Sequence, residues 1–216
     1  MSNMLTLRPV VELSEPAATR TWPARTPPPG GWLTLHAGCP PEEVEAFLAN
    51  LAANVEVEPP GSRDQVVDAL LGEDPLLAAG GLRLEDSATG ASLSPGCCAG
   101  LEDWREWTSA LDGGAPWLGH DPRPEIEMRG ELLRAWQHGG PRRHGPYVDL
   151  TRAGLAELLA SAQADLVGFL DRLDHWARDS GLGARGAALV AAVDRDFEIT
   201  TPLTLPGGGP GRRYLT

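Results

Sequence analysis

The chain has 216 residues, of which 42% are hydrophobic, and it carries a net charge of −12. This length and hydrophobic share fit one domain with a substantial core, and they exclude a collagen-like or wholly disordered chain. Because so acidic a surface repels phosphate groups, we expect neither nucleic acid nor an anionic membrane as a partner.

The composition also indicates a compartment. All 18 basic residues are arginine, a bias typical of proteins encoded by GC-rich bacterial genes. The three cysteines are an odd number, which suits a reducing compartment better than a disulfide framework. The N-terminus lacks the basic and apolar regions of a secretion signal, and no apolar run approaches the length of about 18 residues that spans a membrane. We therefore expect a cytoplasmic protein.

An N-terminal arm, residues 1–30, is expected to precede the main domain. Residues 5–13 can form a strand, but Pro9 has no N–H to donate, which confines that strand to a sheet edge or interrupts it. Residues 14–30 are rich in proline, threonine and alanine. Such a composition predicts an extended segment laid over the surface.

Two helices are expected next, after a short strand at residues 32–36. Pro40 and Pro41 open the first helix, because a proline is tolerated where the backbone N–H has no helical partner. Ser62 and Gln65 open the second with the spacing of a capping box, in which each side chain bonds the backbone N–H of the other. Both helices carry one apolar face, so both are expected to pack on the core.

The middle of the chain predicts a β-hairpin, then a tryptophan-rich helix, and then a second hairpin or a long bent strand. Residues 80–95 and 125–136 alternate apolar side chains around turn residues, with Gly130 at the second turn. Residues 101–112 have helical spacing. At the α-helical period Trp107 falls outside their apolar stripe, so we expect it to reach the surface or a pocket.

The last part of the chain is predicted to be helical. A polar loop at 137–146 leads to an apolar stripe over 151–180, which as one helix would be about 42 Å long, and we expect a bend or break near Gly168. A further helix is expected at 187–197 and an extended tail at 201–216. Together these elements predict an α+β fold, in which a single antiparallel or mixed sheet is covered by helices.

The resulting organisation is one α+β domain over residues 31–200, with a long C-terminal helical segment at 151–197. Gly181 begins a G-x-G-x-x-G match, but a helix rather than a strand precedes it, so the match predicts an interhelical turn and no nucleotide cofactor.

Metal binding is one hypothesis for the cysteines. His36 and Cys39 have the spacing of a ligand pair, and Cys97 and His120 are further candidate ligands. The adjacent side chains of Cys97 and Cys98 are expected to diverge, however, which argues against a shared ion. The alternative is that the cysteines are small apolar residues packed at a crowded turn.

A catalytic thiol is the second hypothesis. Cys98 precedes the expected start of the helix at 101–112, where unpaired N–H groups favour a thiolate. His120 could serve as its base and Asp121 as the group that orients the imidazole, in the logic of a cysteine triad.

Protein binding is the function that we favour from the sequence. The chain has no recognisable catalytic motif, and its charge suits a basic protein partner. Trp107 and Trp117 are the candidate partner-binding residues, because tryptophan is enriched at binding hot spots. An immunity or antitoxin-like protein would have these properties. The alternative is a small-molecule enzyme or sensor that uses the cysteine and histidine residues.

Overall fold

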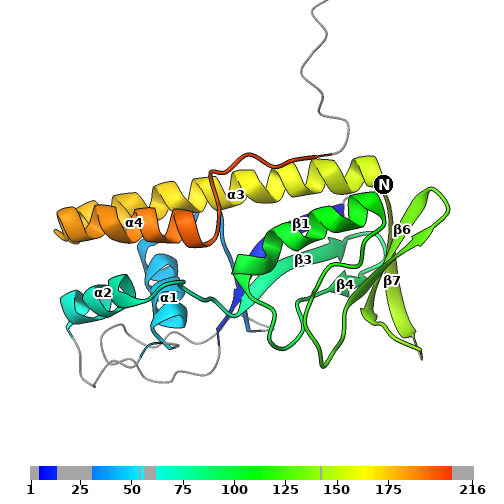
Figure 1. Ribbon diagram of the computed structural model, residues 1–216, viewed down its shortest axis with the longest axis horizontal. Coiled ribbons are helices and arrows are strands. Elements are labelled where there is room, and N and C mark those ends of the chain that lie inside the picture. The colour runs from blue at the N-terminus through cyan, green and yellow to red at the C-terminus, as the bar shows by residue number, and fades with distance from the viewer. Residues whose placement is uncertain (1–4, 14–30, 54, 56–61, 142, 206–216) are drawn as a thin grey trace, which may run out of the picture.

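The computed structural model describes residues 5–13, 31–53, 55, 62–141 and 143–205 (Figure 1). The strands are β1 (Leu5–Glu12), β2 (Trp32–Thr34), β3 (Gly80–Asp86), β4 (Ser92–Leu93), β5 (Glu125–Arg129), β6 (Leu132–His138) and β7 (His144–Thr151). The helices are α1 (Pro41–Ala52), α2 (Arg63–Gly72), η1 (Leu101–Asp112), α3 (Arg152–Asp179) and α4 (Ala184–Asp196). The α+β class and the long C-terminal helix are therefore confirmed, whereas the expected arm at 14–30 and the end of the tail lie outside the described residues.

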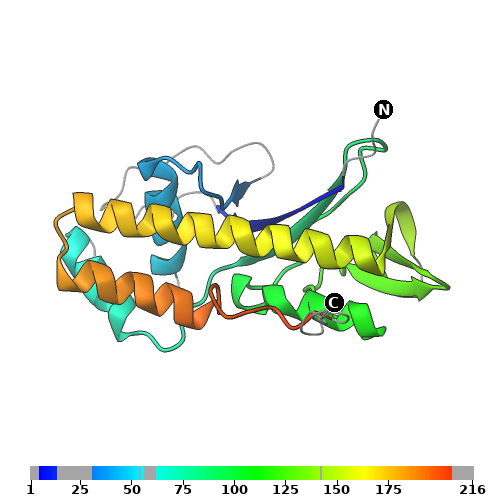
Figure 2. The same ribbon diagram turned by 90° about the horizontal axis from the view of Figure 1, so that it is seen from above.

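The strands divide into two antiparallel sheets, where the sequence suggested one. The first has the order β2-β1-β3-β4 and the second the order β5-β6-β7. The helix α3 contacts β1 in the first sheet and β7 in the second, and α4 lies alongside it (Figure 2). Gln137 also joins the sheets, because its side-chain amide accepts the N–H of Ser94 at 2.6 Å and donates to the Ser94 carbonyl at 3.1 Å.

Pro9 lies in an inner strand rather than at an edge. On one side β1 keeps its pairing with β3, where Pro9 lies opposite Leu82. On the other side the Pro9 carbonyl accepts the N–H of Leu35 at 2.9 Å, just after β2 has ended at Thr34. The N–H and C=O of one residue point to the same side of a strand. The N–H that Pro9 lacks would therefore lie on the side of Leu35, just beyond the end of β2, and not on the side of β3. The pairing of β1 with β3 is kept for this reason.

The expected helix starts are confirmed and the expected break is not. In α2 the Ser62 side chain accepts the Gln65 N–H at 3.3 Å, and the Gln65 side chain accepts the Ser62 N–H at 2.7 Å. The helix α3 continues through Gly168 for 28 residues without interruption. A Cβ at Gly168 would lie 2.6 Å from the Cβ of Ala37, so this glycine permits a close approach of the neighbouring loop.

The tryptophan-rich helix η1 is a 3-10 helix, and this changes which of its residues are buried. With about three residues per turn, side chains three positions apart share one face. Leu101, Trp104, Trp107 and Ala110 are all buried accordingly. The expectation that Trp107 lies outside the apolar stripe was therefore wrong, because it assumed the α-helical period.

In the second sheet, the side of each strand that faces the core and the length of the strands differ from the sequence prediction. The two-residue turn at Gly130 pairs Arg129 with Leu132, so even-numbered residues of β5 and β6 face opposite sides. Leu132 is 40% exposed and Leu133 is 1% exposed. The expected loop at 137–146 is also shorter than predicted, because β6 runs to His138 and β7 begins at His144. As an outer strand, β7 tolerates the proline and glycine near its start.

One hydrophobic core lies between the helices and both sheets. Phe47 of α1 makes edge contacts with Phe169 of α3 at 4.9 Å and with Phe197, after α4, at 6.3 Å. The Trp104 indole donates to the Phe197 carbonyl at 2.8 Å, which fastens η1 to the end of α4. By length and composition α3 could also cross a membrane, although its buried stripe contributes to this core.

Candidate functional site

A two-residue antiparallel bridge joins Cys97, in the turn before η1, to His120. The Cys97 N–H donates to the His120 carbonyl at 2.6 Å, and the His120 N–H donates to the Cys97 carbonyl at 3.0 Å. Side chains of directly opposed residues point to the same face of such a pair. The bridge therefore places a sulfur and an imidazole on one side of the backbone.

Two glycines allow the backbones to come this close. A Cβ at Gly96 would lie 2.7 Å from the His120 nitrogen, and a Cβ at Gly119 would lie 2.6 Å from the carbonyl carbon of Gly96. Gly119 also has φ of +90°, a conformation that side chains other than glycine rarely adopt. Sequence reasoning missed Gly119 as a determinant of the site.

The side chains of Cys97 and Cys98 converge, contrary to our expectation. Cys98 has φ of +62°, which reverses the chain direction locally and brings the two sulfurs to 3.6 Å. Both residues are exposed. The view that they pack at a crowded turn as small apolar residues is therefore wrong for this pair.

The proposed triad residues lie together in the structure. His120 Nδ1 is 3.2 Å from an Asp121 carboxylate oxygen, and one ligand atom each of Cys97, Cys98 and His120 lies within 4.8 Å of the others. A hydrogen bond with Cys98, followed by charge repulsion from it, raises the pKa of the Cys97 thiol.

The hollows beside this turn are lined by its neighbours rather than by its sulfurs. Pro95 borders both a small cavity below the turn and an open hollow next to His138. A catalytic thiol needs a bound substrate within reach of the sulfur and the base. Neither of these two hollows is lined by Cys98 or His120.

His36 and Cys39 form a separate group with Glu43 and do not join Cys97 and His120. Cys39 is fully buried, and burial raises the pKa of its thiol to about 12. Its sulfur accepts the His36 N–H and donates to the Thr34 carbonyl, both at 3.4 Å. These contacts shape the turn before α1, so Cys39 is the structural cysteine of the chain.

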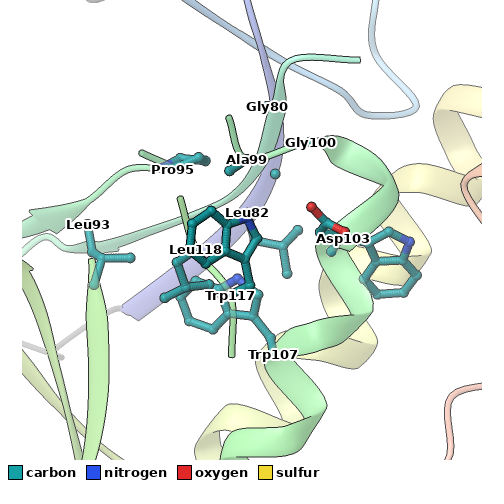
Figure 3. A pocket seen from close by; sticks show the side chains of 12 residues that line it. Gly80, Leu82, Leu93, Pro95, Ala99, Gly100, Asp103, Trp107, Trp117 and Leu118 are labelled. Atoms are coloured by element: carbon teal, nitrogen blue, oxygen red, sulfur yellow. The ribbon is translucent and has the colours of Figure 1, made fainter. Parts of the chain in front are cut away.

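The two candidate tryptophans line the same cavity, but one is buried and the other is accessible to solvent. Trp107 is 2% exposed and Trp117 is 48% exposed, and both indoles border the space shown in Figure 3. Its volume of about 10 Å³ holds one water molecule at most. Trp107 thus belongs to the core, and only Trp117 is accessible to a partner.

Trp117 also lines a larger hollow, of about 240 Å³. Its walls combine apolar residues with the charged side chains of Glu106, Arg123 and Glu125. Glu106 is exposed on η1, and Glu125 is paired with Arg143 at 2.5 Å. Sequence reasoning did not predict that Glu106 and Trp117 would share this hollow, because the conformation of the turn between them determines it.

Comparison with protein-family models, with curated protein sequences and with solved structures found no match.

Proposed function

We propose that the protein is a non-catalytic protein-binding domain, which docks a basic segment of its partner on Trp117. The observation that carries this proposal is the exposure of Trp117, 48% of which is accessible at the wall of the 240 Å³ hollow. Exposed tryptophans next to a concave surface are typical binding hot spots.

The indole of Trp117 is held in place before any partner arrives. Pro116 and Leu118, its two neighbours in the chain, are both buried, and the inner side of the ring adjoins the cavity that it shares with Trp107. A side chain that is already ordered loses little conformational entropy on binding. This supports Trp117 as an anchor.

Carboxylates outnumber arginines among the residues that line the hollow with Trp117, with Glu106 and Glu125 against Arg123. The helix η1 contains four carboxylate residues and one arginine, and its Glu106 lines the hollow with Trp117. An arginine or lysine side chain placed over the indole would gain a cation–π contact and an ion pair with Glu106. The net charge of −12 would attract such a partner over a longer range.

An immunity or antitoxin protein that masks a basic partner would use a surface of this kind. We place the protein in the cytoplasm as part of the proposal, because all three cysteines are free thiols and free thiols persist in reducing compartments.

The test is binding of a fluorescent hexa-arginine peptide to the full chain, measured by anisotropy at low and high salt. We expect Trp117→Ala to weaken binding about fivefold through loss of the cation–π contact, and Glu106→Gln to weaken it as well. Leu132→Ala is the matched control, because Leu132 is 40% exposed but lies at the β5–β6 turn. Hexa-glutamate should not bind.

Equal binding of hexa-arginine by wild type and Trp117→Ala would contradict the proposal, since it would show diffuse charge attraction. Absence of binding at low salt would contradict it too. Wild-type protein and Trp117→Ala would then serve as baits in a lysate from the source organism. A basic protein captured by the first bait alone, and released by salt, would support the proposal.

A further inference from the structure

The structure brings three soft ligand atoms together on one exposed turn. Cys97, Cys98 and His120 each offer an atom that lies within 4.8 Å of the other two, and all three residues are exposed. We propose that they form a binding site for a thiophilic divalent cation of the zinc class. The proposal does not rest on partner docking at Trp117, although the Trp117 and His120 rings are neighbours, with centroids 6.3 Å apart.

The spacing of the sulfurs fits a shared ion. Two thiolates at about 2.3 Å from a tetrahedral zinc ion are roughly 3.8 Å apart. The Cys97 and Cys98 sulfurs are 3.6 Å apart already, so both can bind one ion with a small rotation of their side chains. Adjacent cysteines seldom reach this spacing, and here the left-handed conformation of Cys98, with φ of +62°, provides it.

The backbone fixes the third ligand relative to the sulfurs. The paired hydrogen bonds between Cys97 and His120, at 2.6 and 3.0 Å, keep the two side chains on one face. The Asp121 carboxylate lies 3.2 Å from Nδ1 of His120. Carboxylates that accept the proton of one ring nitrogen orient the other nitrogen toward a metal. Asp121 is therefore the positioning residue, and Nε2 of His120 is the proposed ligand.

The donor set determines the class of ion. Two thiolates and one imidazole favour zinc and its heavier congener cadmium over magnesium or calcium, which prefer oxygen ligands. Three protein ligands leave the fourth tetrahedral position to solvent, as in open zinc sites rather than in closed structural ones. Because the ligands are exposed, the ion would exchange with solution.

The experiment titrates the reduced full chain with Cd²⁺ under anaerobic conditions, followed by the thiolate-to-cadmium absorption band, and then competes with Zn²⁺ by calorimetry. We expect one ion per chain. Cys97→Ser and Cys98→Ser should each remove about half of the band and weaken binding at least tenfold. His120→Gln should weaken binding about tenfold and leave the two-thiolate band intensity unchanged at saturation.

The control is His36→Gln, in the second group of potential ligands, which should leave both stoichiometry and band unchanged. Glu106→Gln, which should weaken peptide docking, should also leave them unchanged, so failure of the docking proposal and failure of the ion site are distinguishable. No ion bound by the reduced wild type would overturn the proposal. So would a band that survives both cysteine substitutions, or one that disappears in His36→Gln.

Discussion

Gly119→Ala tests the close approach that builds the cysteine–histidine turn. A Cβ there would lie 2.6 Å from both the carbonyl carbon and the oxygen of Gly96, and 2.8 Å from the oxygen of Cys97. These are backbone atoms, so no flexible side chain can yield. We expect about 1–3 kcal/mol from the overlap, in addition to about 1–2 kcal/mol for placing alanine in the left-handed region.

The matched substitution Gly140→Ala separates the cost of atomic overlap from the cost of the left-handed conformation. Gly140 has φ of +84°, close to the +90° of Gly119, but an added Cβ at Gly140 would meet nothing within 4 Å. Gly140→Ala should therefore cost only the conformational part, about 1–2 kcal/mol. Urea unfolding of both variants measures the difference, with equal m-values as the check that both unfold in the same way. Equal destabilisation of the two variants would refute the close approach at Gly119.

Three further changes test the core and the second sheet. Trp104→Phe removes the indole N–H that donates to the Phe197 carbonyl at 2.8 Å and should cost about 1–3 kcal/mol in urea unfolding; an unchanged stability would contradict this. The hydrogen bonds from the Arg134 guanidinium hold the pKa of the Asp149 carboxyl below its usual 3.8. The ionised Asp149 therefore stabilises the fold above that pH, and this stabilisation is lost as the pH falls through the lower folded-state pKa. The difference in unfolding free energy between wild type and Asp149→Asn should therefore vanish in acid, and a pH-independent difference would argue against the ion pair. Gly168→Ala should lower the melting temperature in spite of the better helix propensity of alanine, because its Cβ would lie 2.6 Å from that of Ala37, and Ala37→Gly should restore part of the loss.

Local signals in the sequence were sufficient for the α-helices. The capping box at Ser62 and Gln65 involves residues three positions apart, and both of its hydrogen bonds are present. The apolar stripe at 151–180 likewise depends only on its own period, and α3 covers Arg152–Asp179. The role of Gly168 was not readable in this way, because its neighbour Ala37 is remote in the chain.

The strands and η1 show where a periodic pattern is ambiguous. Both helical periods place Leu101 and Trp104 close together on one face, and the burial of Trp107 beside them follows only from the 3-10 geometry. In the second hairpin, the number of residues in the turn at Gly130 decides which side of β6 faces the core. A hydrophobic pattern alone therefore predicts neither whether a helix is α or 3-10 nor how many residues a turn has.

The cysteine pair shows most clearly how local reasoning can select neighbouring residues and assign them the wrong geometry. Sequence alone indicated Cys98, His120 and Asp121 as a set, because a thiol, an imidazole and a carboxylate can form a cysteine triad. The convergence of the sulfurs, however, depends on φ at Cys98, and that left-handed conformation belongs to a turn whose neighbour is bridged to His120. The bridge in turn needs glycine at position 119, more than twenty residues beyond Cys97. A long-range backbone contact thus determines what two adjacent side chains can bind, and adjacency by itself predicts neither convergence nor divergence.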